Sequence, residues 1–119
     1  MLVRRFFDDG WLMKYFYFDN TTQEGVESNA TLEGQEADIL NAWETLSPVE
    51  GSFLGVYCEN GQIMQFMWEE NYIQLDIPDA DRSGSMQKPV TRSEASELLQ
   101  QTIRGADPSE IPDLEFFQW

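Results

Sequence analysis

Histidine is absent from this chain of 119 residues, cysteine occurs once, and lysine occurs only at Lys14 and Lys88. Without histidine there is no side chain whose ordinary pKa lies near neutrality, so Ser-His-Asp and Cys-His nucleophile systems and His-ligated metal sites are excluded. The single cysteine, Cys58, excludes an internal disulfide and a thiolate zinc site. We interpret Cys58 as a small core residue on a strand of a protein from a reducing compartment.

Several longer motifs are also missing. No GxGxxG or GxxxxGK[ST] pattern supports a phosphate-cradling loop. No run approaches the ~18–20 apolar residues of a membrane span. The opening MLVRRFFDDGW meets two aspartates after its basic pair, so it lacks the apolar core of a secretory signal. We therefore expect a cytoplasmic protein that does not contact a membrane.

Basic residues are missing from the whole of segment 15–81, which carries fourteen carboxylates and accounts for nearly all of the net charge of −15. Such a one-signed charge destabilises a compact domain by self-repulsion, and solubility needs a net charge of magnitude only ~2–8. The excess predicts a surface that attracts a basic partner. It also makes nucleic acid and anionic membranes poor partners.

The first half of the chain predicts a strand and a helix. Residues 11–19 form an aromatic, strand-favouring run, and 20–31 is polar without apolar periodicity, which is typical of a loop. From Glu36 to Leu46, apolar residues recur at helical spacing, and Ser47-Pro48 ends the pattern. The apolar stripe consists of Ile39, Ala42, Trp43 and Leu46.

The middle of the chain predicts a three-stranded antiparallel meander over 53–59, 62–68 and 72–77. Asn60-Gly61 separates the first two runs and favours a type I′ hairpin turn. One face of the last two strands is apolar, and we expect it to support the helices. The residues of this face are Met64, Phe66, Trp68, Ile73, Leu75 and Ile77.

The last part predicts a polar loop over 78–89, a second helix and a short terminal strand over 114–119. Thr91 and Glu94 have the spacing of a capping box, and Gly105 suits the residue after the helix. The order is strand, helix, three strands, helix, strand in a single domain of 1–119. This predicts an α+β fold with a mostly antiparallel sheet and two helices packed on one face.

Carboxylates are the remaining candidates for catalytic or metal-binding groups, but their spacing in the sequence does not indicate catalysis. Glu69-Glu70 would be adjacent on opposite faces of a strand unless a turn brings them together. With Asp76 as the first position of an EF-hand loop, the third and sixth positions are Pro78 and Asp81, so the calcium pattern fails. We expect no enzyme activity, no cofactor and no metal, although an enzyme using paired carboxylates is an alternative.

Residues 51–119 resemble a known family. The hairpin SFLGVYCENGQIMQFMW precedes the loop ADRSGSMQKPV, the helix TRSEASELLQQTIRG and the ending PSEIPDLEFFQW. This is similar to the Imm1 family of immunity proteins from bacterial polymorphic-toxin systems, in which an alanine- and leucine-bearing helix precedes a Gly-x-x-Pro ending that closes on tryptophan. The matching residues are Ala95, Leu98, Leu99, Ile103, Gly105, Pro108 or Pro112, Leu114 and Trp119. The chain departs from the pattern by a second proline and a stretched ending.

The resemblance implies a small cytosolic α+β protein that binds and silences a cognate toxin, with nucleic-acid-targeting deaminases among the expected targets. It carries over no catalytic residues. We expect a monomer or weak homodimer that meets its basic partner through residues at the hairpin end and its loop: Glu59, Glu69, Glu70, Tyr72, Asp76, Asp79 and Asp81. The alternatives are a nucleic-acid mimic that inhibits a DNA- or RNA-binding protein and a scaffold domain whose acidity serves only solubility or salt adaptation.

Overall fold

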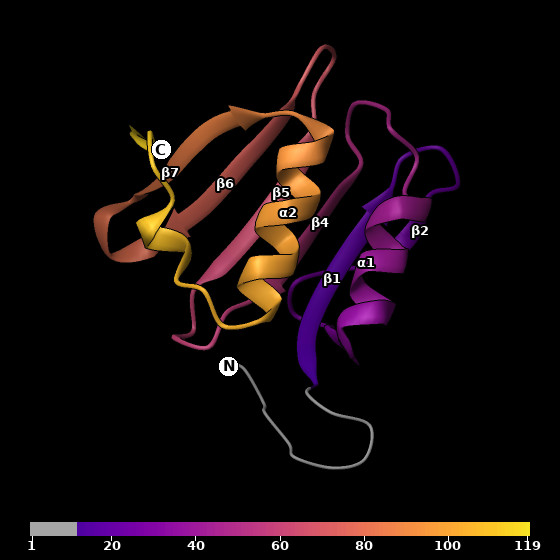
Figure 1. The fold of residues 1–119 in the computed structure, drawn as a ribbon. Coiled ribbons are helices and arrows are strands. Elements are labelled where there is room, and N and C mark those ends of the chain that lie inside the picture. Colours follow the sequence, from indigo (N-terminus) through magenta and orange to yellow (C-terminus); the bar gives the residue numbers. More distant parts are fainter. Residues whose placement is uncertain (1–11) are drawn as a thin grey trace.

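Two helices cover one face of an antiparallel sheet in the computed structural model, which describes residues 12–119 (Figure 1). The helices are α1 (Glu36–Thr45) and α2 (Arg92–Ile103). The strands are β1 (Met13–Asp19), β2 (Glu24–Val26), β3 (Leu32–Gly34), β4 (Phe53–Tyr57), β5 (Ile63–Trp68), β6 (Ile73–Asp79), β7 (Gly84–Val90) and β8 (Glu115–Gln118). The predicted α+β class and the packing of both helices on the sheet are confirmed. The predicted strand residue Trp11 and the segment MLVRRFFDDGW lie outside the described residues.

The spatial order of the strands is β2-β1-β4-β5-β6-β7-β8, and β3 pairs with β1 on the same edge as β2. Every pairing is antiparallel, so side chains alternate between a face that the helices cover and a face that they do not. No helix in the described part of the chain is long and apolar enough to span a membrane.

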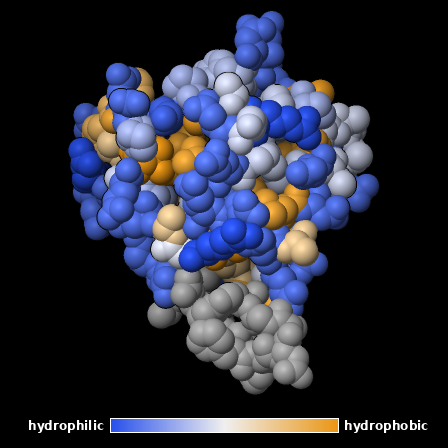
Figure 2. Space-filling model, in the orientation of Figure 1, coloured by the Kyte–Doolittle hydropathy of each residue, from blue (hydrophilic) through white to orange (hydrophobic). Residues whose placement is uncertain are grey.

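The core lies between the helices and the sheet, as the apolar stripes predict. Trp43 is 1% exposed, stacks on Trp68 with ring centroids 6.1 Å apart, and donates from its indole nitrogen to Ser96 Oγ at 3.2 Å. The sheet contributes Leu54, Val56, Met64, Phe66, Ile73, Leu75 and Ile77, and the helices Ile39, Ala95, Leu99 and Ile103. Around this core the helix-bearing face is largely hydrophilic, with smaller apolar areas (Figure 2).

Each helix begins with a reciprocal cap. In α2, Glu94 N donates to Thr91 Oγ1 at 3.1 Å and Thr91 N donates to Glu94 Oε1 at 2.9 Å, which confirms the predicted capping box. Gly105 follows that helix with a φ of 104°, the left-handed conformation expected of a residue that ends a helix. In α1 the box is built on Gln35 and Asp38 and was not predicted.

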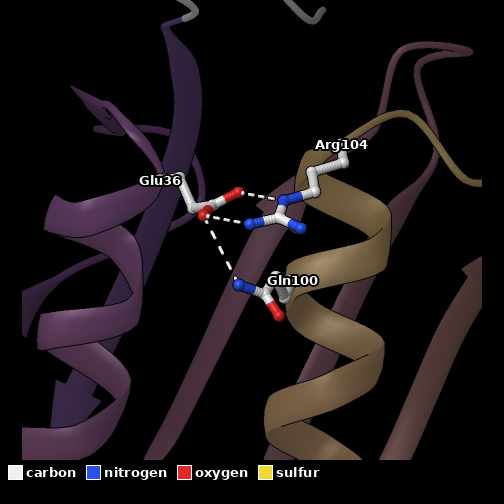
Figure 3. A network of polar contacts seen from close by, with 3 residues as sticks. All are labelled: Glu36, Gln100 and Arg104. Carbon is white, nitrogen blue, oxygen red and sulfur yellow. Dashed lines mark hydrogen bonds and ion pairs between the residues drawn. The ribbon is translucent and has the colours of Figure 1, made fainter.

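A polar network joins the two helices (Figure 3). The Arg104 guanidinium donates to Glu36 Oε1 at 2.8 Å and to Glu36 Oε2 at 3.0 Å, and Gln100 Nε2 reaches the same carboxylate at 3.5 Å. The arginine lowers the pKa of Glu36, and Glu36 raises the pKa of Arg104. This is the one ion pair that joins two residues within 12–119.

The expected loop over 20–31 is partly wrong, because β2 forms within it and β3 follows it. Both strands are three residues long and pair with different halves of β1. Gly25 permits the first pairing, since a Cβ there would overlap the Tyr17 backbone. Such short strands have too few residues to show a period of two in the sequence.

The expected loop over 78–89 is also wrong, because β6 continues to Asp79 and β7 occupies Gly84–Val90. A short 3₁₀ turn over Ala80–Arg82 and a left-handed Ser83, with φ of 53°, reverse the chain between them. The loop was predicted from the polar composition of the segment, and Pro89 also weakens its strand pattern. The proline is accommodated because β8 pairs with residues 84–87 only, so Pro89 lies beyond the end of that ladder.

The β4–β5 hairpin is confirmed, but its turn type is not. A type I′ turn requires a positive φ at both central residues. Gly61 has a φ of 87°, but the φ of Asn60 is not positive. Gly61 N donates to Cys58 O at 3.0 Å and Cys58 N to Gln62 O at 2.7 Å. This pattern fits a three-residue turn closed by a left-handed glycine. The Asn60 side chain accepts a hydrogen bond from Gln62 N at 2.9 Å.

On the face without helices, an aromatic ring covers a glycine. Phe16 on β1 lies opposite Gly55 on β4 and is 3% exposed. Phe53 and Tyr57 each contact its ring edge to face, with centroids 6.2 Å away. A Cβ at Gly55 would overlap the Phe16 ring. Glycine at this position therefore lets the phenylalanine lie flat against the sheet.

Candidate partner-binding surface

The seven residues predicted to bind a partner lie in three separate places. Consecutive turns of an antiparallel meander lie at opposite ends of its strands, so the 58–62 turn and the 69–72 turn are separated by the length of β5. Glu59 therefore lies at one end with Asp79 and Asp81, while Glu69, Glu70 and Tyr72 lie at the other. Asp76 is within β6. The clustering on one side that supported the prediction is wrong, and partner binding by these residues stays a prediction.

The end that carries the 69–72 turn is built from three loops held together by hydrogen bonds. Gly51 N donates to Trp68 O at 3.0 Å, and Trp68 N donates to Ser52 O at 2.8 Å. Asn20 connects the third loop, since its Nδ2 donates to Glu50 O at 2.9 Å and its N to Ser52 Oγ at 2.9 Å. We call this surface the acidic rim; it comprises Val49, Glu50, Glu69, Glu70 and Tyr72.

The acidic rim combines carboxylates with exposed apolar groups. Tyr72 is 48% exposed and Val49 is 40% exposed. At the start of α2, the basic Arg92 lies over the Trp68 ring at 5.7 Å and donates to Glu44 O at 3.3 Å. Within residues 12–119 no basic side chain forms an ion pair with the rim carboxylates.

The opposite acidic end surrounds the 58–62 turn and comprises Glu59, Asp79, Asp81 and Asp107. A pocket of ≈ 450 Å³ lies between residues 60–63 and 78–81. A second pocket, lined by Glu59 and Asp107, adjoins it at Asn60. Arg82, the basic residue beside this end, lies 4.0 Å over the Phe116 ring.

Asp76 belongs to a polar ladder on the face without helices. It is 4% exposed, and its two carboxylate oxygens accept hydrogen bonds from Gln65 Nε2 and Gln87 Nε2, each at 2.9 Å. Gln74 Nε2 extends the ladder by donating to Gln87 Oε1 at 2.9 Å. The structure gives Asp76 a role within the sheet, and we leave it out of the proposed surface.

Two of the described groups with shifted pKa values, Cys58 and Asp19, serve the fold. Burial raises the pKa of the Cys58 thiol to about 12, so the sulfur stays protonated. Hydrogen bonds from Ser47, then Thr22 and Thr21, lower the pKa of Asp19 to about 2. No group of three histidine, cysteine or acidic residues in the described range is placed to hold a metal ion.

Sequence reasoning missed Glu50 and Asp107. The position of Glu50 could have been predicted, because the predicted β4–β5 hairpin brings residues just before β4 beside residues just after β5. Asp107, in the segment after α2, lines the same pocket as Glu59. The two residues are far apart in the sequence, and no local signal indicates that they share a pocket.

Comparison with known proteins identifies no family, because no family model, no curated protein and no solved structure matches the chain.

Proposed function

We propose that this chain is a non-catalytic inhibitor that binds a basic protein, as an immunity protein binds a cognate toxin domain. The observation that carries the proposal is the charge: fourteen carboxylates without one basic residue over 15–81. Within residues 12–119, Glu36 is the carboxylate of this segment that forms an ion pair with a described basic side chain. The Imm1-like pattern of residues 51–119 adds the expectation that the partner is a toxin.

The physical advantage of the charge lies in association. A toxin that acts on nucleic acid needs a basic surface to hold phosphates, and clustered carboxylates can occupy that surface. Complementary charge raises association rates by ~10–10³ over a neutral pair, and salt removes the gain. An inhibitor that must reach its toxin quickly benefits from this effect.

We assign the binding surface to the acidic rim. Its three loops are fixed by hydrogen bonds between backbone groups and by those of Asn20 and Ser52, so ordering them on binding costs little conformational entropy. Tyr72 and Val49 supply exposed apolar area beside Glu50, Glu69 and Glu70. An aromatic group with a polar surround is typical of the residues that contribute most to binding energy.

The test is a capture experiment from lysate of the source organism at low salt, with elution by about 0.5 M salt, where exposed charges more than a few ångströms apart are screened. Three forms of the chain are compared: the wild type, Glu69→Lys with Glu70→Lys, and Asp79→Lys with Asp81→Lys. The two variants change the net charge equally, at opposite ends of the sheet. Mass spectrometry identifies the eluted proteins.

We expect the wild type and the Asp79/Asp81 variant to capture one dominant basic protein, and the Glu69/Glu70 variant to lose it. Equal loss in both variants would place the attraction in the overall charge and contradict the assignment to the rim. Several unrelated nucleases would favour a nucleic-acid mimic. A broad mixture of ribosomal and DNA-binding proteins would contradict a specific inhibitor.

A further inference from the structure

A polar pocket of ≈ 290 Å³ lies between α1 and the edge of the sheet formed by β1 and β3. Figure 1 shows α1 lying in front of β1, and residues of both elements line the pocket. Its polar and apolar lining includes Tyr15, Tyr17, Leu32, Asp38, Asn41 and Thr45. Neither the acidic rim nor the opposite acidic end contains these residues.

Tyr15 lines this pocket together with the more deeply buried Asp19. Tyr15 is only 9% exposed, yet its hydroxyl has no hydrogen-bond partner among the described residues. The hydroxyl reaches the open space of the pocket, since the buried polar side-chain atom left without a partner in the described range is Trp68 Nε1, and it can therefore hydrogen-bond to a ligand there. Gly34 lets two groups meet here, because its Cβ position would lie 3.0 Å from Tyr15 Cε1 and 3.3 Å from Asp38 Oδ2.

The charge around the pocket is negative. Asp38 Oδ2 accepts a hydrogen bond from Gln35 N at 2.9 Å, which leaves Oδ1 available. Asp19 also lines the pocket, and its pKa of about 2 keeps it ionised at neutral pH. Thr45 lies in the last turn of α1, and this end of the helix carries the partial negative charge of the helix dipole. None of the described residues that line the pocket is basic.

The lining also suits an alkyl chain. Leu32 is 37% exposed at the mouth, and Ala42 and Leu46 add apolar walls. The ring of Tyr17 offers a surface for a cation, and the hydroxyl of Tyr15 and the side-chain oxygens of Asp38 and Asn41 offer acceptors. An apolar stem that ends in a cationic head matches both parts of the pocket.

We propose that this pocket binds the side chain of a lysine or arginine that the basic partner inserts between α1 and β1. The proposal rests on the proposed function, since it names how that partner is anchored. Hydrogen bonds connect the wall of the pocket to the acidic rim: Asp19 accepts from Ser47 N and Oγ at 2.9 Å, and the next residue, Asn20, donates to Glu50 O.

The pocket can be tested without the partner. The probes are N-acetyl-arginine amide and N-acetyl-lysine amide, with uncharged N-acetyl-citrulline amide as the control, each titrated into the labelled full chain and followed by backbone amide NMR shifts. We expect saturable shifts in α1 and β1 with the cationic probes alone. Tyr15→Phe should weaken binding about ten-fold, the effect of one hydrogen bond to a charged group.

Two further variants complete the test: one removes another acceptor from the pocket, and the other is a control outside it. Asn41→Ala removes an acceptor from an exposed helix position and should also weaken binding without loss of stability. Gln101→Ala, at an exposed position of α2 outside the pocket and the acidic rim, should leave probe binding unchanged. Shifts that fail to saturate, or that are equal in all variants, would overturn the pocket, while capture of a partner through the rim would remain unaffected.

A second experiment distinguishes two possible ligands of the pocket, a side chain of the partner and a free small amine. Once the partner is captured, Tyr15→Phe should increase its dissociation rate several-fold, since lost contacts act mainly on dissociation. Saturable probe binding with an unchanged dissociation rate would overturn the assignment to a partner side chain and indicate a free alkyl cation instead.

Discussion

Replacing Gly55 by alanine should destabilise the protein, and the size of the effect should depend on Phe16. The added Cβ would overlap the Phe16 ring, which is buried and held between Phe53 and Tyr57. Because neighbours on both sides restrict the ring, it cannot move away at little cost. Forcing an extra methyl group into such a packed site costs typically 1–3 kcal/mol.

The same substitution should be neutral or stabilising when the ring is absent. Phe16→Leu removes the ring atoms that meet the new Cβ. Gly55 has no positive φ, so alanine is compatible with its backbone, and a strand alanine gains roughly 0.5–1 kcal/mol over glycine. The two substitutions should therefore be coupled by at least about 1 kcal/mol, as expected for residues in direct contact.

Urea unfolding of the wild type, Gly55→Ala, Phe16→Leu and the double variant measures this coupling. With a denaturant slope of ~1–3 kcal/mol/M, Gly55→Ala should lower the urea midpoint by roughly 1 M in the wild type and leave it unchanged or raised in the Phe16→Leu background. Equal losses in both backgrounds would show that the Phe16 ring does not determine the cost, and would refute the packing argument.

Two other predictions concern titrating groups. Because burial raises the pKa of Cys58 to about 12, its reaction with a thiol reagent at pH 8 should be slow in the native protein and fast in denaturing urea; similar rates in both would contradict the burial. The folded state lowers the pKa of Asp19 from its ordinary 3.8 to about 2, so its contribution to stability should be lost as the pH falls from about 4 to 2. Urea midpoints measured across that range should fall less steeply in Asp19→Asn, and equal slopes would argue against the Ser47, Thr21 and Thr22 hydrogen bonds as its source.

The elements with strong periodicity could be predicted from the sequence. The stripe of Ile39, Trp43 and Leu46 and the box of Thr91 and Glu94 are local patterns, and both helices formed where these patterns lie. The four strands 13–19, 53–57, 63–68 and 73–79 also fall within or near their predicted ranges. Each of these signals depends on residues within about ten positions of one another.

What the sequence could not indicate depends on distant pairing. β7 is stabilised by ladders to β6 and β8, which override Pro89, Gly84 and the polar composition of the segment. The predicted grouping of the partner-binding residues was wrong for a similar reason. Placing them on one side of the molecule requires knowing at which end of the meander each turn lies. The Tyr15 pocket requires β3 and Gly34, and that strand carried no sequence signal.

The association rate of the purified chain with its captured partner, measured by stopped flow across a range of ionic strengths, tests the central claim most directly. The account predicts that the wild-type rate falls by ~10–10³ as salt is raised. The Glu69→Lys, Glu70→Lys variant should associate more slowly and with a weaker salt dependence than the matched Asp79→Lys, Asp81→Lys variant. A wild-type rate independent of salt, or identical behaviour of the two variants, would contradict recognition through the acidic rim.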